Sequence, residues 1–404
     1  MTKRNYKSSS PVLLRGLPFL LTLMLFLSLM LTMTGQEAQA ESSQAGEEDE
    51  ALPEYSITLS DAQSSSSCGS VTFSGGTVTI TEAGSYTLTG SLSDGQICVD
   101  TARESKVRLI LDGVSITSSG SAAIYVRSAD KVVISLKDGT SSTLGNGGSF
   151  VQSDENNVDG VIFSKDDLTI KGNGSLTISS PAGHGIVGKD DLKIKGGTVS
   201  VTAARKSLSA NDTLTVDDGV LTLNAGTEGM EASNVVINGG SVSVQAGDDG
   251  INATWTSDTT RPAVEINGGS LTIVMGAGDT DGVDSNGDLV ITGGTIDITG
   301  SSSFDIDGSV TFTGGTVIVN GQQVESIPNQ MMGMGGFGGM GRGGMGAMGQ
   351  GSGQDMSGFP GGASGEENGF FPGQDGSGAF GGFGGMGGGR HGMGGSGGPD
   401  TFGA

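Results

Sequence analysis

The feature that most constrains this chain is an internal repeat of about 22 residues. Residues 160–170 return as residues 185–194, and looser copies start at Ser207, Gly229 and Gly250. Counted from Gly185, these starts are 22, 22 and 21 residues apart. A unit this short cannot bury its own apolar face, so it has to stack on its neighbours. The repeat therefore predicts a fold in which successive units lie side by side.

Each repeat also contains a short run in which aliphatic residues alternate with Ser or Thr. One run follows Gly196-Gly197, and another follows Gly239-Gly240. A period of two residues is typical of a strand with one buried face, and no helical period is present. The sequence lacks the nonapeptide units of a β-roll and the Leu and Asn ladder of a leucine-rich repeat.

From these patterns we predict an all-β fold over residues 55–327. The expected architecture is a right-handed parallel β-helix, a solenoid of about ten coils stacked at about 4.8 Å, with three short strands in each coil. One aliphatic set should form inward stacks from coil to coil. Its members are Leu168, Ile170, Leu192, Ile194, Leu214, Val216, Val235, Ile237, Leu289 and Ile291.

The two ends of the chain differ from the repeats in composition. Residues 1–40 combine basic residues, an apolar run and a small-x-small site, which predicts a signal peptide and a secreted, extracellular protein. An uncleaved membrane anchor is the alternative; after cleavage no stable membrane insertion is expected. Residues 41–54 form an acidic, Ser-rich linker. Residues 328–404 are rich in Gly, Met and Phe, which predicts a disordered tail.

Charge narrows the possible partners. The net charge is −24, and removal of residues 1–40, with four positive charges and one negative, would make it −27. Such a chain repels nucleic acid, whereas divalent cations or a merely solvated surface suit it. The only cysteines are Cys68 and Cys98, too few for a zinc ribbon or finger. They can form a disulfide between adjacent coils or remain two buried free thiols.

Alignment of the repeats on their opening Gly places a row of ionisable residues directly before it. The row consists of Asp159, His184, Lys206, Glu228, Asp249 and Asp281. Asp248, Asp279 and Asp284 crowd its C-terminal half, and Asp305 and Asp307 follow. Carboxylates within about 5 Å of one another repel unless a cation lies among them, and oxygen ligands suit Ca²⁺. This predicts calcium at Asp248–Asp284, although Asp-Gly is also an ordinary turn sequence.

Residues suited to contact with sugars or to catalysis are scarce. Trp255 is the only Trp and lies in the one long insertion, between Gly250 and Gly282. It can serve as a platform for a sugar ring or as a plug over the insertion's own small core. The sequence contains only two histidines, which leaves few candidates for a histidine-based catalytic triad. Arg205 and Lys206 could contact substrate or supply the base of a calcium-assisted elimination, but paired charges of this kind are also common as structure. Glu228 is the carboxylate expected nearest to Lys206.

Several repeats resemble a known family. The motifs at residues 164–170, 188–197 and 247–251 are similar to those of the secreted carbohydrate-binding domain family typified by a clostridial cellulose- and pectin-binding protein. The resemblance covers roughly residues 55–321. It implies a pectate-lyase-like β-helix, bound calcium and a binding rather than a catalytic role. Its calcium positions would correspond to Asp248-Asp249, Asp159 and Asp281, whereas Arg205-Lys206-Ser207 departs from the pattern.

Three functions are compatible with these features. The first is non-catalytic, calcium-dependent binding of cell-wall polysaccharide, of the acidic pectin type or cellulosic. The second is a calcium-dependent polysaccharide lyase, and the third is an extracellular structural or adhesive surface protein. The scarcity of acid–base residues favours binding over elimination.

Overall fold

The computed structural model describes residues 51–257, 259–276 and 280–329, and the predicted signal peptide and most of the predicted tail lie outside these ranges. The chain divides into two units, Met1–Met340 and Gly341–Ala404, and every described residue belongs to the first. The described residues are all-β and contain no helix. Accordingly, no helix in these ranges could span a membrane.

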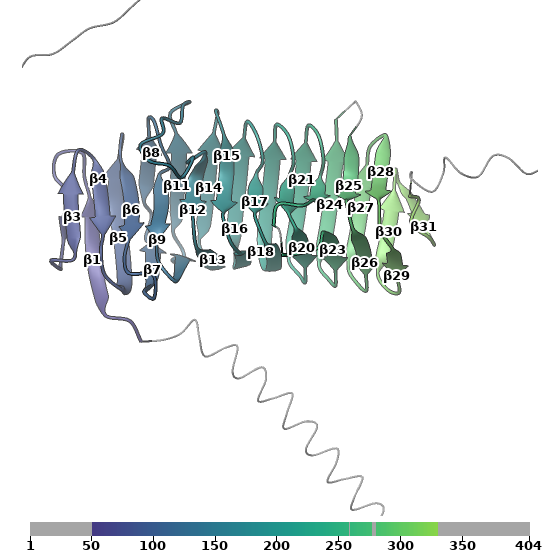
Figure 1. Cartoon of the computed structure of the whole chain (residues 1–404), viewed down its shortest axis with the longest axis horizontal. Coiled ribbons are helices and arrows are strands. Elements are labelled where there is room, and N and C mark those ends of the chain that lie inside the picture. Colours follow the sequence, from purple (N-terminus) through teal and green to yellow (C-terminus); the bar gives the residue numbers. More distant parts are fainter. Residues whose placement is uncertain (1–50, 258, 277–279, 330–404) are drawn as a thin grey trace, which may run out of the picture. The chain divides into compact units, whose positions relative to one another are not determined.

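Two large sheets contain all the strands (Figure 1). The 11-stranded sheet consists of β3 (Val71–Ser74), β4 (Thr77–Ile80), β6 (Gln96–Asp100), β9 (Ile124–Ser128), β12 (Gly160–Ser164), β15 (His184–Gly188), β17 (Leu208–Ala210), β19 (Met230–Ala232), β22 (Ile251–Ala253), β25 (Asp281–Ser285) and β28 (Ser302–Ile306). Along this sheet each strand pairs with the equivalent strand of the next repeat, and only β3 and β4 pair antiparallel.

The 20-stranded sheet holds the remaining strands. It consists of β1 (Glu54–Leu59), β2 (Ser65–Ser66), β5 (Gly84–Leu92), β7 (Lys106–Leu111), β8 (Ser115–Ser118), β10 (Lys131–Leu136), β11 (Ser141–Asn146), β13 (Asp167–Gly172), β14 (Ser175–Ser180), β16 (Leu192–Ala203), β18 (Thr213–Ala225), β20 (Asn234–Ile237), β21 (Ser241–Ala246), β23 (Ala263–Ile266), β24 (Ser270–Met275), β26 (Asp288–Ile291), β27 (Thr295–Thr299), β29 (Val310–Phe312), β30 (Thr316–Val319) and β31 (Gln322–Val324).

The connectivity of this sheet corrects the predicted β-helix solenoid of separate three-strand coils. Long strands β5 and β16 each pair with strands of two rows, so β5, β7, β10, β13, β16, β14, β11 and β8 form a closed ring of parallel pairings. In its hydrogen bonding the fold is a closed eight-stranded parallel β-barrel with additional strands. The physical reason is that β16 continues through Gly196 and Gly197, whose positive φ values of 156° and 93° turn the strand without ending it.

The inward positions of the strands form one aliphatic core. All the predicted inward residues, from Leu168 to Ile291, are 0 to 1% exposed, which confirms that part of the prediction. Leu192 shows the stacking, since it pairs with Leu168 on one side and Leu214 on the other. Burial of each such side chain stabilises the fold by roughly 1.5–3 kcal/mol, and every repeat adds further side chains of this kind.

A smaller apolar cluster lies apart from this core. It joins Cys98, Tyr125, Phe163 and Val187 with residues of the segment before β12. Tyr125 donates a hydrogen bond to Asp154 Oδ2 at 2.7 Å, which ties that segment to the sheet.

The predicted disulfide is not formed. Cys68 and Cys98 are free thiols, because Cys68 packs against the main core beside Ser66 and Ser70 whereas Cys98 belongs to the separate cluster around Tyr125.

The first strand and the contacts of Asn329 lie at the two ends of the described fold. The first strand begins at Glu54, one residue before the predicted start. At the other end, the Asn329 side chain donates to Ile306 O at 2.9 Å and accepts from Ile306 N at 3.1 Å. Ordered contacts therefore extend two residues beyond the predicted boundary at residue 327.

Candidate functional site

The first row of the candidate site lies where the strands of the 11-stranded sheet begin. The backbone carbonyls of Lys206, Glu228, Asp249 and Asp281 each accept a hydrogen bond of 2.9 to 3.2 Å. In each case the donor is the backbone amide of the residue that follows the preceding member of the row. The predicted row is therefore confirmed from His184 to Asp281. It is wrong by one position for Asp159, because the register pairs Gly160, not Asp159, with His184.

A Gly follows every member of this row except Lys206, which Ser207 follows, and this Gly has a packing role. A Cβ at Gly229 would lie 2.3 Å from Val244 Cγ1 and 2.5 Å from Gly250 O, closer than a side chain allows. Glycine is needed here because core and backbone meet at this corner. The row side chains are thereby held at the rim of the sheet.

A second row faces outward from the middle of the same strands. In strand order it consists of Cys98, Tyr125, Phe163, Val187, Ser209, Glu231, Asn252, Asp284 and Asp305. Its N-terminal half is apolar and lies in the small cluster described above. Its C-terminal half is polar and ends in adjacent carboxylates. The polar part of this row lies on β17, β19, β22, β25 and β28. We call the outward side of these five strands the outer face.

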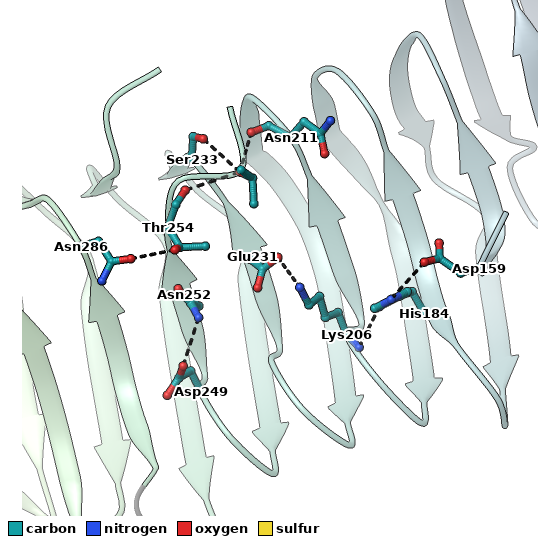
Figure 2. Close-up of polar contacts among 11 residues, drawn as sticks. Asp159, His184, Lys206, Asn211, Glu231, Ser233, Asp249, Asn252, Thr254 and Asn286 are labelled. Carbon is teal, nitrogen blue, oxygen red and sulfur yellow. Dashed lines mark hydrogen bonds and ion pairs between the residues drawn. The ribbon is translucent and has the colours of Figure 1, made fainter. Parts of the chain in front are cut away.

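Polar contacts link residues of the two rows from β15 to β22 (Figure 2). His184 is 8% exposed, accepts from Lys206 N at Nδ1 (3.2 Å) and has Nε2 3.5 Å from Asp159 Oδ2. Burial lowers the pKa of His184 to about 4; Asp159 opposes this shift, while Lys206 and Arg205 add to it. His184 is therefore neutral at physiological pH.

Lys206 forms an ion pair with Glu231, which is 6% exposed (Figure 2). Burial raises the pKa of Glu231, and the hydrogen bond and charge of Lys206 oppose the rise. The sequence suggested Glu228 as the main partner of Lys206. The structure corrects this, because Glu231 faces outward on β19 whereas Glu228 precedes the strand. Arg205 is exposed, and its backbone amide donates to Gly183 O.

The acidic end of the outer face contains Asp249, Asp281 and Asp284. Asp249 Oδ1 accepts from Asp281 N, and its Oδ2 accepts from Asn252 Nδ2, both at 3.2 Å. Burial raises the pKa of Asp249 to about 7; the Asp281 hydrogen bond opposes the rise, and the charges of Asp284 and other aspartates add to it.

Asp284 has the same electrostatic problem. Burial raises its pKa to about 6, and the charges of Asp281, Asp305, Asp307 and Asp248 raise it further. Its strand neighbours in the outward row are Asn252 and Asp305. Carboxylates that keep protons near neutral pH lack sufficient positive charge around them.

The donor chemistry at this end suits a hard cation, but the protein does not enclose one by itself. Asn252 Oδ1 is buried without a hydrogen-bond partner in the described structure. Among the described residues, however, no three Asp, Glu, His or Cys side chains converge on a point where they could hold a metal ion. Asp248 is exposed, and the predicted ligand Asp279 lies outside the described residues. The predicted ligand Asp159 lies instead beside His184.

Trp255 lies on the segment after β22, with 62% of its surface exposed. It is therefore not a plug over a core. The two residues that flank Trp255 hold this segment in place (Figure 2). Thr254 Oγ1 donates to Asn286 Oδ1 at 2.7 Å, and Thr256 Oγ1 donates to Asn211 O at 2.6 Å. The ring is thus displayed on an anchored segment.

The sequence analysis missed Glu231 and Asn252. Glu231 and Asn252 each lie two residues after the Gly that opens their repeat, as Asp284 does after Gly282. Since alternate residues of a strand share a face, this spacing could have revealed the outward row.

The fold and this outer face define an all-β repeat protein with one extended polar surface. A sequence model of the carbohydrate-binding domain-containing protein family matches residues 74–325, so the chain belongs to that family. A carbohydrate-binding domain-containing protein of Acetivibrio thermocellus is 45% identical over 128 residues, which are 31% of this chain. The match spans 45% of that relative's length.

A solved structure is also similar. It is that of the polysaccharide lyase-like protein from C. thermocellum, in a gadolinium derivative. It is 31% identical, has a TM-score of 0.50, and the match covers 66% of this chain and 96% of that one.

Proposed function

We propose that this protein binds acidic polysaccharide of the pectin type outside the cell, without cleaving it, and that calcium is required. The binding surface is the acidic end of the outer face, on β22, β25 and β28. The observation that carries the proposal is a group of oxygen atoms: the buried Asp249, the unpartnered Asn252 Oδ1 and the neighbouring Asp284. The raised pKa of Asp249, about 7, and of Asp284, about 6, supports it. Two carboxylates that compete for protons at neutral pH form a site that is completed by a cation.

The incomplete donor set explains why polymer and calcium would bind together. Ca²⁺ takes about six to eight oxygen ligands, and when bound it would neutralise carboxylates of both partners. The outer face offers Asp249, Asp284 and the unpartnered Asn252 Oδ1. Uronate carboxylates of the polymer would supply the missing oxygens. Without calcium, a chain of net charge −24 repels a polyuronate.

The basic residues of the outer face are poorly suited to proton abstraction. A lysine base needs a free amine, but the amine of Lys206 is engaged in an ion pair with the buried carboxylate of Glu231. His184 is buried, and its pKa of about 4 makes it a weak base. These contacts support binding rather than elimination, and they agree with the family's description.

Trp255 is the element of the site that would contact sugar rings directly. Flat aromatic faces stack on the apolar faces of pyranose rings, and a fixed ring loses little conformational entropy on binding. Trp255 lies three residues after Asn252 in the same repeat. A polymer that follows the acidic row could therefore reach it, with Lys206 and Arg205 as further polar contacts.

The test is retention of the full chain by immobilised polygalacturonate, with calcium or with EDTA. We expect retention with calcium only, loss of retention in Asp249→Asn and Asp284→Asn, and full retention in the matched control Asp138→Asn, whose side chain is exposed in a turn of the other sheet. Retention that is equal in EDTA would overturn the proposal.

The same incubations distinguish binding from cleavage. Elimination produces an unsaturated uronide that absorbs in the ultraviolet. We expect no rise in absorbance for the wild type. A steady rise that Lys206→Ala abolishes would make the chain a lyase, as the name of its structural neighbour allows.

A further inference from the structure

A pocket at the N-terminal end of the sheets is independent of the outer face. It has a volume of about 420 Å³ and lies between the segment after β1, the β3–β4 hairpin and the turn after β5. This volume is within the range of small-ligand sites. β3 ends the 11-stranded sheet, and β25 lies near its opposite end, so the pocket and the acidic end are on the order of 40 Å apart at strand spacing.

The pocket combines an apolar floor with an aromatic wall. Val78 and Leu92 are 1% and 3% exposed and form part of its lining. Phe73 lies opposite Val78 in the hairpin, yet 41% of its surface is exposed. A phenyl ring that is open to solvent beside an apolar floor offers a stacking surface for a small ligand.

Polar groups line the rest of the pocket, and two of them are fixed in place. Asp61 Oδ1 accepts from Ser93 N at 2.7 Å, and this hydrogen bond lowers the pKa of Asp61, which remains ionised. Asp94 accepts from Ser119 N at 2.9 Å and from Ser119 Oγ at 3.0 Å. Gln63 is exposed and adds an amide that can donate and accept.

The backbone around the pocket is also held in shape. Gly75 and Gly76 have φ values of 55° and 84°, as in a tight two-residue hairpin turn. Gly76 O accepts from Gln96 N at 3.1 Å, and a Cβ at Gly76 would lie 2.7 Å from Asp94 O. The hairpin therefore touches the opposite wall, and the pocket is formed before any ligand arrives.

We propose that this pocket binds a neutral sugar unit of a polysaccharide, without calcium. An aromatic face with nearby carboxylate and amide groups matches a ring that has apolar C–H faces and hydroxyl edges. Asp61 and Asp94 would repel a uronate and accept hydrogen bonds from hydroxyl groups. The chain then has two sugar sites of different specificity, which allows it to hold two polymers or two segments of one.

The test is saturation-transfer NMR on the full chain in EDTA, a condition in which the acidic site should not bind. The probes are cellotetraose, xylotetraose, galactotetraose and tetragalacturonate. We expect transfer to at least one neutral probe and none to the acidic one. Phe73→Ala should weaken that binding about tenfold, the loss expected when ring stacking and its buried area are removed.

Two further variants make the test specific. Val274→Ala removes another side chain that is 40% exposed, and it should bind like the wild type. Trp255→Ala should also leave this binding unchanged. Absence of transfer to all the neutral probes, equal binding by Phe73→Ala, or loss in Trp255→Ala alone would overturn the pocket proposal. None of these results bears on calcium-dependent retention by polygalacturonate, so the two proposals can fail separately.

Discussion

Substitution of Asp249 by Asn should stabilise the calcium-free protein. Folding raises the pKa of this carboxyl from its ordinary value of 3.8 to about 7, with burial as the first cause. At about 1.36 kcal/mol per pKa unit, the ionised group costs up to about 4 kcal/mol at neutral pH. Solvent near the exposed Asp248 screens part of this, so we expect a gain of about 2 kcal/mol in the variant.

The local hydrogen bonds can adapt to this substitution. Asn at position 249 keeps the oxygen that accepts from Asp281 N. Its new amide nitrogen would face the Asn252 nitrogen that now donates to Asp249 Oδ2. Rotation of the Asn252 amide removes that conflict, because it presents the buried, unpartnered Oδ1 as an acceptor. The Asn252 nitrogen then takes the unpartnered position of the oxygen, so the number of unsatisfied groups does not rise.

The assay is thermal unfolding of wild type and variant in EDTA from about pH 5 to about pH 8. Between pH 3.8 and about 7 the folded wild type holds a proton that the unfolded chain has lost, so its free energy of unfolding falls as pH rises through this window. The variant should lose less stability and melt about 4 °C higher at pH 8. Calcium should stabilise the wild type more than the variant.

Three outcomes would refute this reasoning. They are a wild-type melting temperature that is constant over that pH window, a variant that melts lower at pH 8, and an equal calcium response in both proteins. Asp138→Asn is the control for the mere loss of one negative charge.

Other predictions concern packing, pairing and the thiols. Gly229→Ala should lower the free energy of unfolding by about 2 kcal/mol or more, because its Cβ meets Val244 Cγ1 and Gly250 O. An unchanged urea midpoint would contradict the packing argument. Lys206→Ala should cost about 3 kcal/mol by leaving Glu231 buried without its cation, and double replacement with Glu231→Gln should restore part of the loss in the same unfolding assay. Burial raises the pKa of Cys98 to about 11, so iodoacetamide should label Cys68 in the folded protein and reach Cys98 only after unfolding, as peptide mass spectrometry would show.

The sequence was most informative where a rule is local. Alternation with period two identified Leu192 and its stacked equivalents as inward residues, because the side-chain period of a strand depends only on the backbone. The row from His184 to Asp281 followed from the Gly at each repeat start. The same alignment misplaced Asp159, because the first copy holds one more residue between its Gly and the Lys-Asp-Asp motif than the second does.

Features that depend on several strands at once could not be predicted. The closed ring requires β5 and β16 to bend and pair in two rows, and nothing in the repeat length specifies this. The sequence left open whether Cys68 and Cys98 are bonded, because spacing along the chain does not say which cluster each thiol joins. Lys206 was expected near Glu228, but the choice of Glu231 depends on which side chains face outward.

The outward row suggests how a repeat fold places one function along its length. Every repeat contributes one outward side chain at the middle of its strand, so the character of the surface is set by a single position per repeat. At Tyr125, Phe163 and Val187 that position is apolar and is covered by the chain's own segment. At Asp284 it is a carboxylate with a pKa raised to about 6, in a row with Asp305. Because the inward residues are apolar and buried in all these repeats, the core tolerates either surface. The location of the acidic site is therefore a matter of surface residues, and the core only fixes their spacing.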